Sequence, residues 1–187
     1  MNLDWYKELD IDYKKVKKVL FVCTGNTCRS PACEYYFNSM TGWFSSIKAF
    51  SRGSVERSEA IPMELSVKKV IGDRKLLKNL YEHTATKYSE KDFKDADLVF
   101  TMNEESRDNL KKEFPIFKEK IFTLKGFIGQ QEFSNKNLEV QNPFVFDKPK
   151  EGTKEYYTYI QNYANIIEGE IKPLIRRLVE ILFLLKK

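Results

Sequence analysis

The sequence predicts one α/β domain, built on a four-stranded parallel sheet with helices on both faces. Two observations lead to this prediction. Short apolar runs rich in β-branched residues recur along the chain, and segments with helix-start and helix-stop signals separate them. Strands that alternate with helices form βαβ units, in which the strands run parallel.

The first strand is predicted over residues 16–22, an apolar and β-branched run that ends at Cys23. A turn-rich loop follows it. Ser30 and Pro31 then predict the start of a helix, with serine at the cap and proline at the first helical position. That helix leads to a second short strand, predicted over residues 47–51.

The middle of the chain carries further helix and strand signals. Residues 62–71 are predicted to form a helix that begins at a proline, and residues 76–81 a further helical turn. Ser89 is expected to cap a short helix ahead of a third strand over residues 97–101. Asn103 is expected to cap the helix that follows this strand.

The last third of the chain is predicted to be mainly helical. A fourth strand is expected over residues 120–124, and a loop over residues 126–152. Residues 153–187 are predicted to form mostly helix, kinked near Gly169 and Pro173.

Length and composition favour an ordinary folded domain. The chain has 187 residues, of which 42% are apolar and 14% aromatic, enough to build a core. Residues 1–16 are polar and charged, and we interpret them as an N-terminal extension to a domain formed by residues 17–187. No apolar run approaches the ~20 residues of a membrane span, and the N-terminus lacks the apolar region of a secretory signal. We therefore expect a cytoplasmic protein.

The charge balance is mildly basic, with 32 Lys and Arg against 27 Asp and Glu, for a net charge of +5. This excess suits anionic ligands. The sequence has neither an arginine-rich tract nor zinc-finger spacing, so nucleic acid is not expected as a partner.

Three cysteines, Cys23, Cys28 and Cys33, lie within eleven residues. An odd number in one cluster is not the disulfide framework of a secreted domain. Structural zinc cysteines usually stand two to four residues apart, whereas these stand five apart, which argues against a zinc site shared with His83, the only histidine. We expect no metal and no cofactor.

The most informative segment is residues 22–31, VCTGNTCRSP, which places Cys23 six residues before Arg29 at the junction of the first strand and first helix. A loop that enters a helix N-terminus directs backbone N–H groups inward, and the helix dipole adds partial positive charge. Such a loop is an anion nest, and an arginine beside it can bind two phosphate oxygens at once. We therefore expect a phosphate or sulfate ion to bind in this loop.

The same positive field favours the thiolate form of Cys23. A thiolate directed at a bound phosphorus is a nucleophile for phosphoryl transfer through a cysteinyl-phosphate. Gly25 allows close backbone approach, and Asn26 tolerates a left-handed conformation. A nucleotide P-loop would need a Gly-Lys-Ser/Thr ending, which is absent. A lone cysteine at a strand end is usually just packing, so the whole ten-residue string carries the prediction.

That string resembles the signature loop of the low-molecular-weight protein tyrosine phosphatases. The likeness covers about residues 17–180. It extends to four later segments: Ser51-Arg52-Gly53, His83-Thr84-Ala85, residues 97–102 (DLVFTM) and residues 121–124 (IFTL).

The resemblance implies a metal-independent protein phosphatase that hydrolyses phosphotyrosine in a phosphorylated protein or peptide. Cys23 would be the nucleophile and Arg29 the phosphate ligand, while Ser30 would donate to the thiolate. The residues that the resemblance places in substrate binding are Thr24, Gly25, Asn26, Thr27, Cys28, Ser30 and Phe144, and those that it places in support of the loop are Ser51, His83 and Asn142.

Two of these residues have particular roles under the same resemblance. His83 is expected to brace the loop rather than to act as a general base. Cys28 resembles the family's second cysteine, which can form a reversible disulfide that protects the nucleophile from over-oxidation. Cys33, on the helix, is expected in the core.

The sequence departs from the family pattern at the general acid. The family supplies this acid from an Asp-Pro-aromatic loop, but here Asn142 stands before Pro143 and Phe144. An amide cannot give a proton to the leaving oxygen, and loss of general-acid help costs about 10²–10⁴ in rate. Either Asp147, five residues later, replaces the acid, or the acid is missing. In the second case the chain is a slow enzyme or a phosphate-binding module.

The substrate is open between two classes of phosphorylated residue. Tyrosine-specific relatives frequently carry a bulky aliphatic residue at the position of Thr27. A threonine in CTGNTCRS resembles the bacterial protein arginine phosphatases of the same family, because a small polar side chain can admit a guanidinium near the phosphate. Phosphotyrosine is the main prediction and phosphoarginine the alternative.

Overall fold

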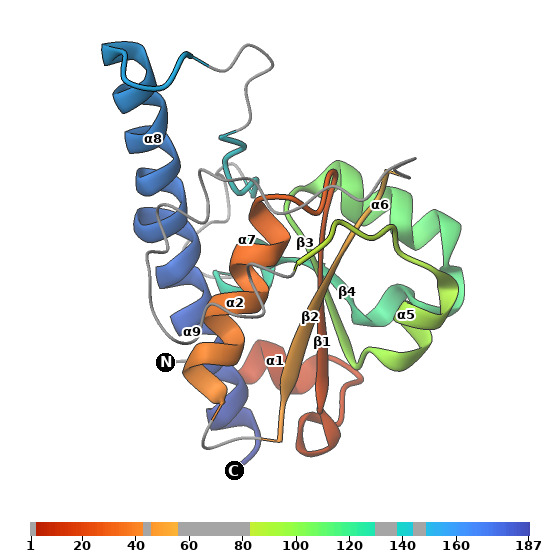
Figure 1. Ribbon diagram of the computed structural model, residues 1–187. Coiled ribbons are helices and arrows are strands. Elements are labelled where there is room, and N and C mark those ends of the chain that lie inside the picture. The colour runs from red at the N-terminus through yellow and green to blue at the C-terminus, as the bar shows by residue number, and fades with distance from the viewer. Residues whose placement is uncertain (1–2, 43–45, 56–82, 130–137, 144–148) are drawn as a thin grey trace.

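A computed structural model describes residues 3–42, 46–55, 83–129, 138–143 and 149–187. The predicted helices over residues 62–71 and 76–81 lie outside the described residues, as do Phe144 and Asp147. The predicted α/β fold is confirmed, because four parallel strands form one sheet in the order β2-β1-β3-β4 (Figure 1). The strands are β1 (Lys18–Cys23), β2 (Lys48–Gly53), β3 (Leu98–Thr101) and β4 (Ile121–Thr123).

The register of the sheet brings the carboxyl ends of its central strands together. Cys23, the last residue of β1, pairs with Gly53, the last residue of β2. On the other side of β1, Val22 pairs with Thr101 at the end of β3. The loop that follows β1 therefore begins at the edge where parallel sheets bind their ligands.

Alternate side chains of β1 enter two separate hydrophobic clusters, one on each face of the sheet. Val19 and Phe21 belong to the larger cluster, whereas Leu20 and Val22 belong to the smaller one. This alternation is the two-residue period of a strand, and burial on both faces explains why the run is continuously apolar. Helices cover both faces, as predicted (Figure 1).

The larger cluster lies under four helices and the N-terminal segment. These helices are α2 (Arg29–Thr41), α7 (Leu124–Ile128), α8 (Lys154–Ile166) and α9 (Lys172–Leu185). The smaller cluster lies under α5 (Glu90–Asp95), α6 (Glu104–Glu113) and the 3₁₀ segment η3 (Pro115–Lys120). In the part of the chain that the structure describes, no helix is long and apolar enough to cross a membrane.

The N-terminal residues pack on the body of the domain. They form α1 (Asp4–Glu8) and a 3₁₀ turn, η1 (Tyr13–Lys15). The Tyr6 hydroxyl donates a hydrogen bond to the Phe127 carbonyl oxygen at 2.7 Å, and the rings of Tyr6 and Phe127 meet edge to face with centroids 5.1 Å apart. This contact attaches the predicted extension to α7.

Three local predictions need correction. Ser30 does not cap the first helix, which begins at Arg29 with Cys28 at the N-cap, because the Ser30 hydroxyl bonds within the loop instead. The predicted strand over residues 120–124 ends at Thr123, whose side chain accepts from the Gly126 N–H and starts α7. The predicted loop over residues 126–152 therefore begins two residues inside a helix.

The helix caps predicted at Asn103 and Ser89 are confirmed, and the helix predicted to kink near Gly169 and Pro173 is interrupted by a π-helical segment that contains Gly169. Asn103 caps α6 by accepting from the Ser106 N–H, and Ser89 forms a capping box with Asp92 at the start of α5. A π-helical segment, η4 (Ile167–Ile171), separates α8 from α9.

Candidate active site

The loop after β1 turns from the sheet edge into the first turn of α2 (Figure 1). The residue after β2 binds the start of this loop, because the Ser54 N–H donates to the carbonyl oxygens of Cys23 and Thr24 at 3.0 and 3.1 Å. Thr24 is exposed, while Gly25 and Thr27 are half-buried. The loop is thus anchored at the strand end, with Thr24 open to solvent and Gly25 and Thr27 partly so.

Two hydrogen-bond donors point at the Cys23 sulfur. The Asn26 backbone N–H lies 3.3 Å from Sγ, and the Ser30 hydroxyl lies 3.0 Å from it. The Ser30 Oγ also receives a hydrogen bond from Asn26 Nδ2 at 3.0 Å, so its own proton is directed at the Cys23 sulfur at 3.0 Å or at the Arg52 carbonyl oxygen at 3.3 Å. Donors to a sulfur atom stabilise its thiolate form, and in this form cysteine is a nucleophile.

Asn26 organises the loop through its backbone and its side chain. Its φ of 51° is the left-handed conformation that asparagine tolerates, and among the described residues no other non-glycine residue has a positive φ. The side chain donates to Ser30 and Ser51 at 3.0 Å and accepts from the Thr86 N–H at 3.0 Å. The backbone carbonyl oxygen of Asn26 lies 2.8 Å from His83 Nε2. The structure therefore places His83 and Ser51 against the loop, at positions that fit the supporting roles expected for them.

Gly53 allows this loop to pass close to β2. A Cβ at this position would lie 3.0 Å from the Thr24 carbonyl oxygen and 3.1 Å from the Asn26 Cβ. Real Cβ atoms rarely come so close to other atoms, and here the neighbours are backbone or near-backbone atoms. The glycine is needed for close approach of backbone to backbone rather than for an unusual φ.

Glu34 is a site residue that the sequence analysis missed. The Ser51 hydroxyl donates to Glu34 Oε2 at 2.6 Å, so a continuous chain of hydrogen bonds runs from this carboxyl through Ser51, Asn26 and Ser30 to the Cys23 sulfur. Burial raises the pKa of the Glu34 carboxyl above its usual value. Glu34 lies four residues after Ser30, on the same face of the helix, and this spacing could have indicated it as a site residue from the sequence.

Arg29 is the first residue of α2 and is almost fully buried, with 5% of its surface exposed. Its Nη1 donates to the Val140 carbonyl oxygen at 3.2 Å and lies 3.9 Å from Glu139 Oε1. Val140 is itself held by its N–H, which donates to the Met102 carbonyl oxygen at 2.8 Å. A segment 111 residues along the chain thus crosses over the start of α2 and fixes the guanidinium, which leaves further N–H groups to bind phosphate oxygens.

The remaining predicted site residues are only partly placed. Asn142 is exposed and lies two residues beyond Val140. Cys28 and Cys33 are both buried, and burial raises the pKa of the Cys33 thiol well above its usual value, as suits the core position expected for it. Within the described ranges, no group of three or more His, Cys, Asp or Glu side chains could hold a metal ion.

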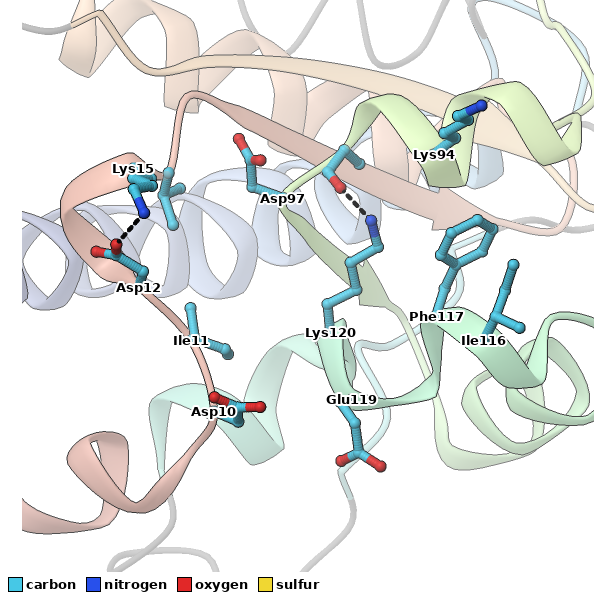
Figure 2. A pocket seen from close by; sticks show the side chains of 12 residues that line it. Asp10, Ile11, Asp12, Lys15, Lys94, Asp97, Ile116, Phe117, Glu119 and Lys120 are labelled. Atoms are coloured by element: carbon cyan, nitrogen blue, oxygen red, sulfur yellow. Dashed lines mark hydrogen bonds and ion pairs between the residues drawn. The ribbon is translucent and has the colours of Figure 1, made fainter.

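A hollow of about 380 Å³ lies at the other end of the sheet (Figure 2). It is lined by residues that precede the strands, among them Val16, Asp97 and Lys120. Lys120 Nζ donates to the Ala96 carbonyl oxygen at 2.5 Å, and burial lowers the pKa of this ammonium. Because Cys23 stands at the carboxyl end of β1, this hollow is separate from the candidate active site.

A cysteine whose sulfur accepts two hydrogen bonds and a buried arginine six residues later stand in one loop between a strand and a helix N-terminus, and this arrangement fits the chemistry of phosphoryl transfer. The family comparison agrees with this geometry. The chain belongs to the low molecular weight phosphotyrosine protein phosphatase family, whose model matches residues 18–180. It is a protein phosphatase of the metal-independent class.

Curated relatives are similar at a moderate level. The chain is 27% identical over 160 residues to the low molecular weight protein-tyrosine-phosphatase PtpA of Staphylococcus aureus, with 81% of this chain and 98% of that protein covered. It is also 27% identical over 113 residues to the protein-arginine-phosphatase of Bacillus subtilis, with 59% of this chain and 71% of that protein covered.

Solved structures include relatives of both kinds. The YwlE arginine phosphatase from Geobacillus stearothermophilus matches with a TM-score of 0.69 and 26% identity, over 90% of this chain and 94% of its own. The low molecular weight protein tyrosine phosphatase from T. tengcongensis matches with a TM-score of 0.66 and 30% identity, over 88% of this chain and 98% of its own.

Proposed function

We propose that this protein hydrolyses phosphotyrosine in phosphorylated proteins or peptides through a cysteinyl-phosphate on Cys23. One observation carries the proposal: the Cys23 sulfur accepts hydrogen bonds from Asn26 N–H and the Ser30 hydroxyl, in a loop that ends at the buried Arg29. This arrangement activates a nucleophile beside a phosphate-binding cation.

The first chemical step transfers the phosphoryl group to sulfur. The Cys23 thiolate attacks phosphorus, the S–P bond forms, and the bond from phosphorus to the tyrosine oxygen breaks in line with the attack. Arg29 and the backbone N–H groups of the loop bind the equatorial oxygens, where charge is spread in the transition state. A general acid gives its proton to the leaving oxygen.

The second step releases the phosphate. A water molecule attacks phosphorus, the S–P bond breaks and its electron pair returns to sulfur, which leaves as thiolate. The Ser30 hydroxyl and the Asn26 N–H stabilise the departing thiolate, since both lie within hydrogen-bond distance of Sγ. Inorganic phosphate is the second product, and as an anion it also binds to the free loop.

We assign the general acid to Asp147, because Asn142 occupies the position before Pro143 and has no proton to give. Asp147 follows Asn142 by five residues. An Asp147→Ala variant is expected to lose about 10²–10⁴ in turnover of phosphotyrosine and to keep most of its turnover of an activated aryl phosphate, whose leaving group needs no proton. Unchanged turnover of phosphotyrosine would contradict the assignment.

Phosphoarginine is the second candidate substrate, and Thr27 favours it. Thr27 is half-buried in the middle of the loop, where a small polar side chain leaves room for a guanidinium. Both the curated relatives and the solved structures include arginine phosphatases. The chemistry at Cys23 would be the same, except that a P–N bond breaks and the guanidine nitrogen takes up the proton.

The two substrates are separated by presenting matched phosphotyrosine and phosphoarginine peptides to the wild-type protein, with Cys23→Ser as the blank. Cys23-dependent release of phosphate from the phosphotyrosine peptide supports the main proposal. Release from the phosphoarginine peptide alone transfers the proposal to the second candidate. If neither peptide is hydrolysed although inorganic phosphate binds, the protein is a phosphate-binding module that has lost its general acid.

We also propose that the protein acts in the cytoplasm. This proposal is supported by the cysteine usage of the sequence, because an odd number of cysteines within eleven residues is not the disulfide framework of a secreted domain.

A further inference from the structure

A partly buried ion pair contacts the backbone on either side of Val140, the partner of Arg29, and the proposed mechanism leaves it without a role. Lys125 of α7 and Glu170 of the π-helical segment η4 are joined by Nζ and Oε1 at 2.5 Å, with only 15% and 20% of their side chains exposed. A partly buried ion pair contributes little to stability by itself, because desolvation offsets much of the attraction. The backbone groups that the pair also binds indicate a more specific role.

Both members of the pair bind the same short stretch of backbone. Lys125 Nζ also donates to the Glu139 carbonyl oxygen at 2.6 Å. Glu170 Oε2 accepts from the Gln141 N–H at 3.2 Å. The ion pair thus holds the residues on either side of Val140, and the Val140 N–H is tied to the Met102 carbonyl oxygen at 2.8 Å.

Val140 is the residue whose carbonyl oxygen accepts from Arg29 Nη1 at 3.2 Å. Four hydrogen bonds therefore fix residues 139–141, and one of them meets the guanidinium. The same stretch leads directly into Asn142 and Pro143. A shift of this backbone would move both the partner of Arg29 and the start of the loop proposed to carry the acid.

The π-helical turn gives Glu170 its position in this arrangement. Residues 167–171 form a wider π-helical turn between α8 and α9, and Glu170 lies in this turn. Irregular turns of this kind inside long helices are frequently found at functional sites. Here the turn joins the C-terminal helix to the backbone beside the phosphate ligand.

We propose that Lys125 and Glu170 are positioning residues for Arg29, acting through the backbone of residues 139–141. They touch neither the substrate nor the reacting atoms. They hold the Val140 carbonyl oxygen, and this oxygen orients the guanidinium for the phosphate. The proposal rests on the proposed function in that Arg29 is the phosphate ligand.

The test compares a charge-matched double variant with a matched control. Lys125→Met with Glu170→Gln removes both hydrogen bonds of Lys125 without leaving a buried charge unpaired. Lys172→Met is the control, since it breaks an ion pair with Glu168 in the same helical region. Lys125→Arg is the conservative variant, because a guanidinium has enough donors to reach both Glu170 and the Glu139 carbonyl.

The readouts are the dissociation constant for inorganic phosphate, kcat and KM on a phosphopeptide, and the melting temperature. We expect the double variant to bind phosphate about 10-fold to 10²-fold more weakly and to raise KM, because a displaced binding group loses most of its contribution. Lys172→Met should bind phosphate as the wild type does, and Lys125→Arg should recover most of the affinity. A lower melting temperature with unchanged phosphate affinity would overturn the proposal, since it would show a merely structural role.

Failure of this proposal can be told apart from failure of the proposed function. If the wild type hydrolyses no phosphopeptide but binds phosphate, the affinities still decide the role of Lys125 and Glu170. If the wild type binds no phosphate at all, Arg29 is not a phosphate ligand and the positioning role is overturned with it.

Discussion

Ser30 and Cys23 are seven residues apart in the chain, yet the Ser30 hydroxyl lies 3.0 Å from the Cys23 sulfur. Asn26 Nδ2 donates to the same hydroxyl, also at 3.0 Å, and this donation orients the serine proton away from the amide. Helix α2 begins at Arg29, two residues earlier than a cap at Ser30 would place its start, so Ser30 lies within its first turn. The serine is thus available to the nucleophile instead of the helix backbone.

Ser30→Ala is expected to lower turnover of a phosphopeptide by about 10-fold to 10²-fold, the worth of one hydrogen bond to a charged group. The loss should lie in kcat, because the hydroxyl acts most strongly on the departing thiolate. Single-turnover kinetics with trapping of the cysteinyl-phosphate will show whether its breakdown is the slowed step. Ser39→Ala is the control on the same helix, where the hydroxyl donates to the Tyr36 carbonyl oxygen at 3.1 Å. Equal effects of the two substitutions would argue against a role at the sulfur.

Gly53→Ala is expected to displace the phosphate loop. The new Cβ would stand 3.0 Å from the Thr24 carbonyl oxygen, so the loop must move by a few tenths of an ångström. Overpacking of this kind costs about 1–3 kcal/mol in the free energy of unfolding. Thermal melts and kcat/KM should both fall. Gly169→Ala provides the comparison, since a Cβ there meets nothing within 4 Å and should leave both quantities near their wild-type values.

The sheet and its loop are predictable from the sequence because their signals are local. The apolar run before Cys23 makes a buried strand, and the segment VCTGNTCRSP marks the loop whichever helices surround it. Asn26 could be assigned its left-handed backbone because few residue types tolerate one. The helix start was misplaced because the Ser30 hydroxyl bonds the Cys23 sulfur, a tertiary contact that competes with capping.

The rest of the site depends on how distant segments are juxtaposed. Glu34 contacts Ser51 because α2 packs on β2. The hydrophobic periodicity of a helix does not predict how the helix is rotated on the sheet. Val140 reaches Arg29 from 111 residues away. Glu170 joins the same region through a π-helical turn. A kink near Gly169 is predictable from the sequence, but the shift in helical register that places Glu170 is not.

Glu34 should make stability depend on pH. Burial raises the pKa of its carboxyl above the usual 4.5, although the Ser51 hydroxyl, His83 and Arg52 oppose the effect. The folded state therefore binds this proton more tightly than the unfolded state does. The resulting stabilisation is fully present below pH 4.5 and is lost as the pH rises through the folded-state pKa.

Glu34→Gln keeps an acceptor for the Ser51 hydroxyl but cannot titrate. Relative to this variant, the wild type should lose stability as the pH rises from about 4.5 towards neutrality. Denaturant unfolding of both proteins across this range measures the difference. A difference in the free energy of unfolding that stays constant with pH would contradict the prediction.

Tyr6→Phe should weaken the attachment of the N-terminal segment to the domain. It removes a buried hydrogen bond of 2.7 Å to the Phe127 carbonyl oxygen while keeping the ring contact, at a cost of about 1 kcal/mol in the free energy of unfolding. Tyr157→Phe is the matched control, because Tyr157 is 67% exposed. Both variants should keep wild-type kcat/KM, since α1 packs on α7, away from the loop after β1. A variant of Tyr6 as stable as the control would show that the contact is dispensable.

Asn142 offers a substitution that should increase activity. If Asp147 supplies the proton from a less favourable place, or if no residue supplies it, Asn142→Asp restores a carboxyl before Pro143, where the family carries its general acid. We expect turnover of a phosphotyrosine peptide to rise by about 10²-fold or more, with a smaller rise on an activated aryl phosphate, because general-acid help matters most for a poor leaving group.

The combination of Asn142→Asp with Asp147→Ala identifies the source of the proton in the wild type. If Asp147 is the acid, its loss should slow the wild type strongly but should slow the Asn142→Asp background little, because the new carboxyl then carries the proton. Equal losses in both backgrounds would mean that Asp147 acts on something other than the leaving group. A failure of Asn142→Asp to increase turnover, together with intact phosphate binding, would show that residue 142 does not reach the leaving oxygen.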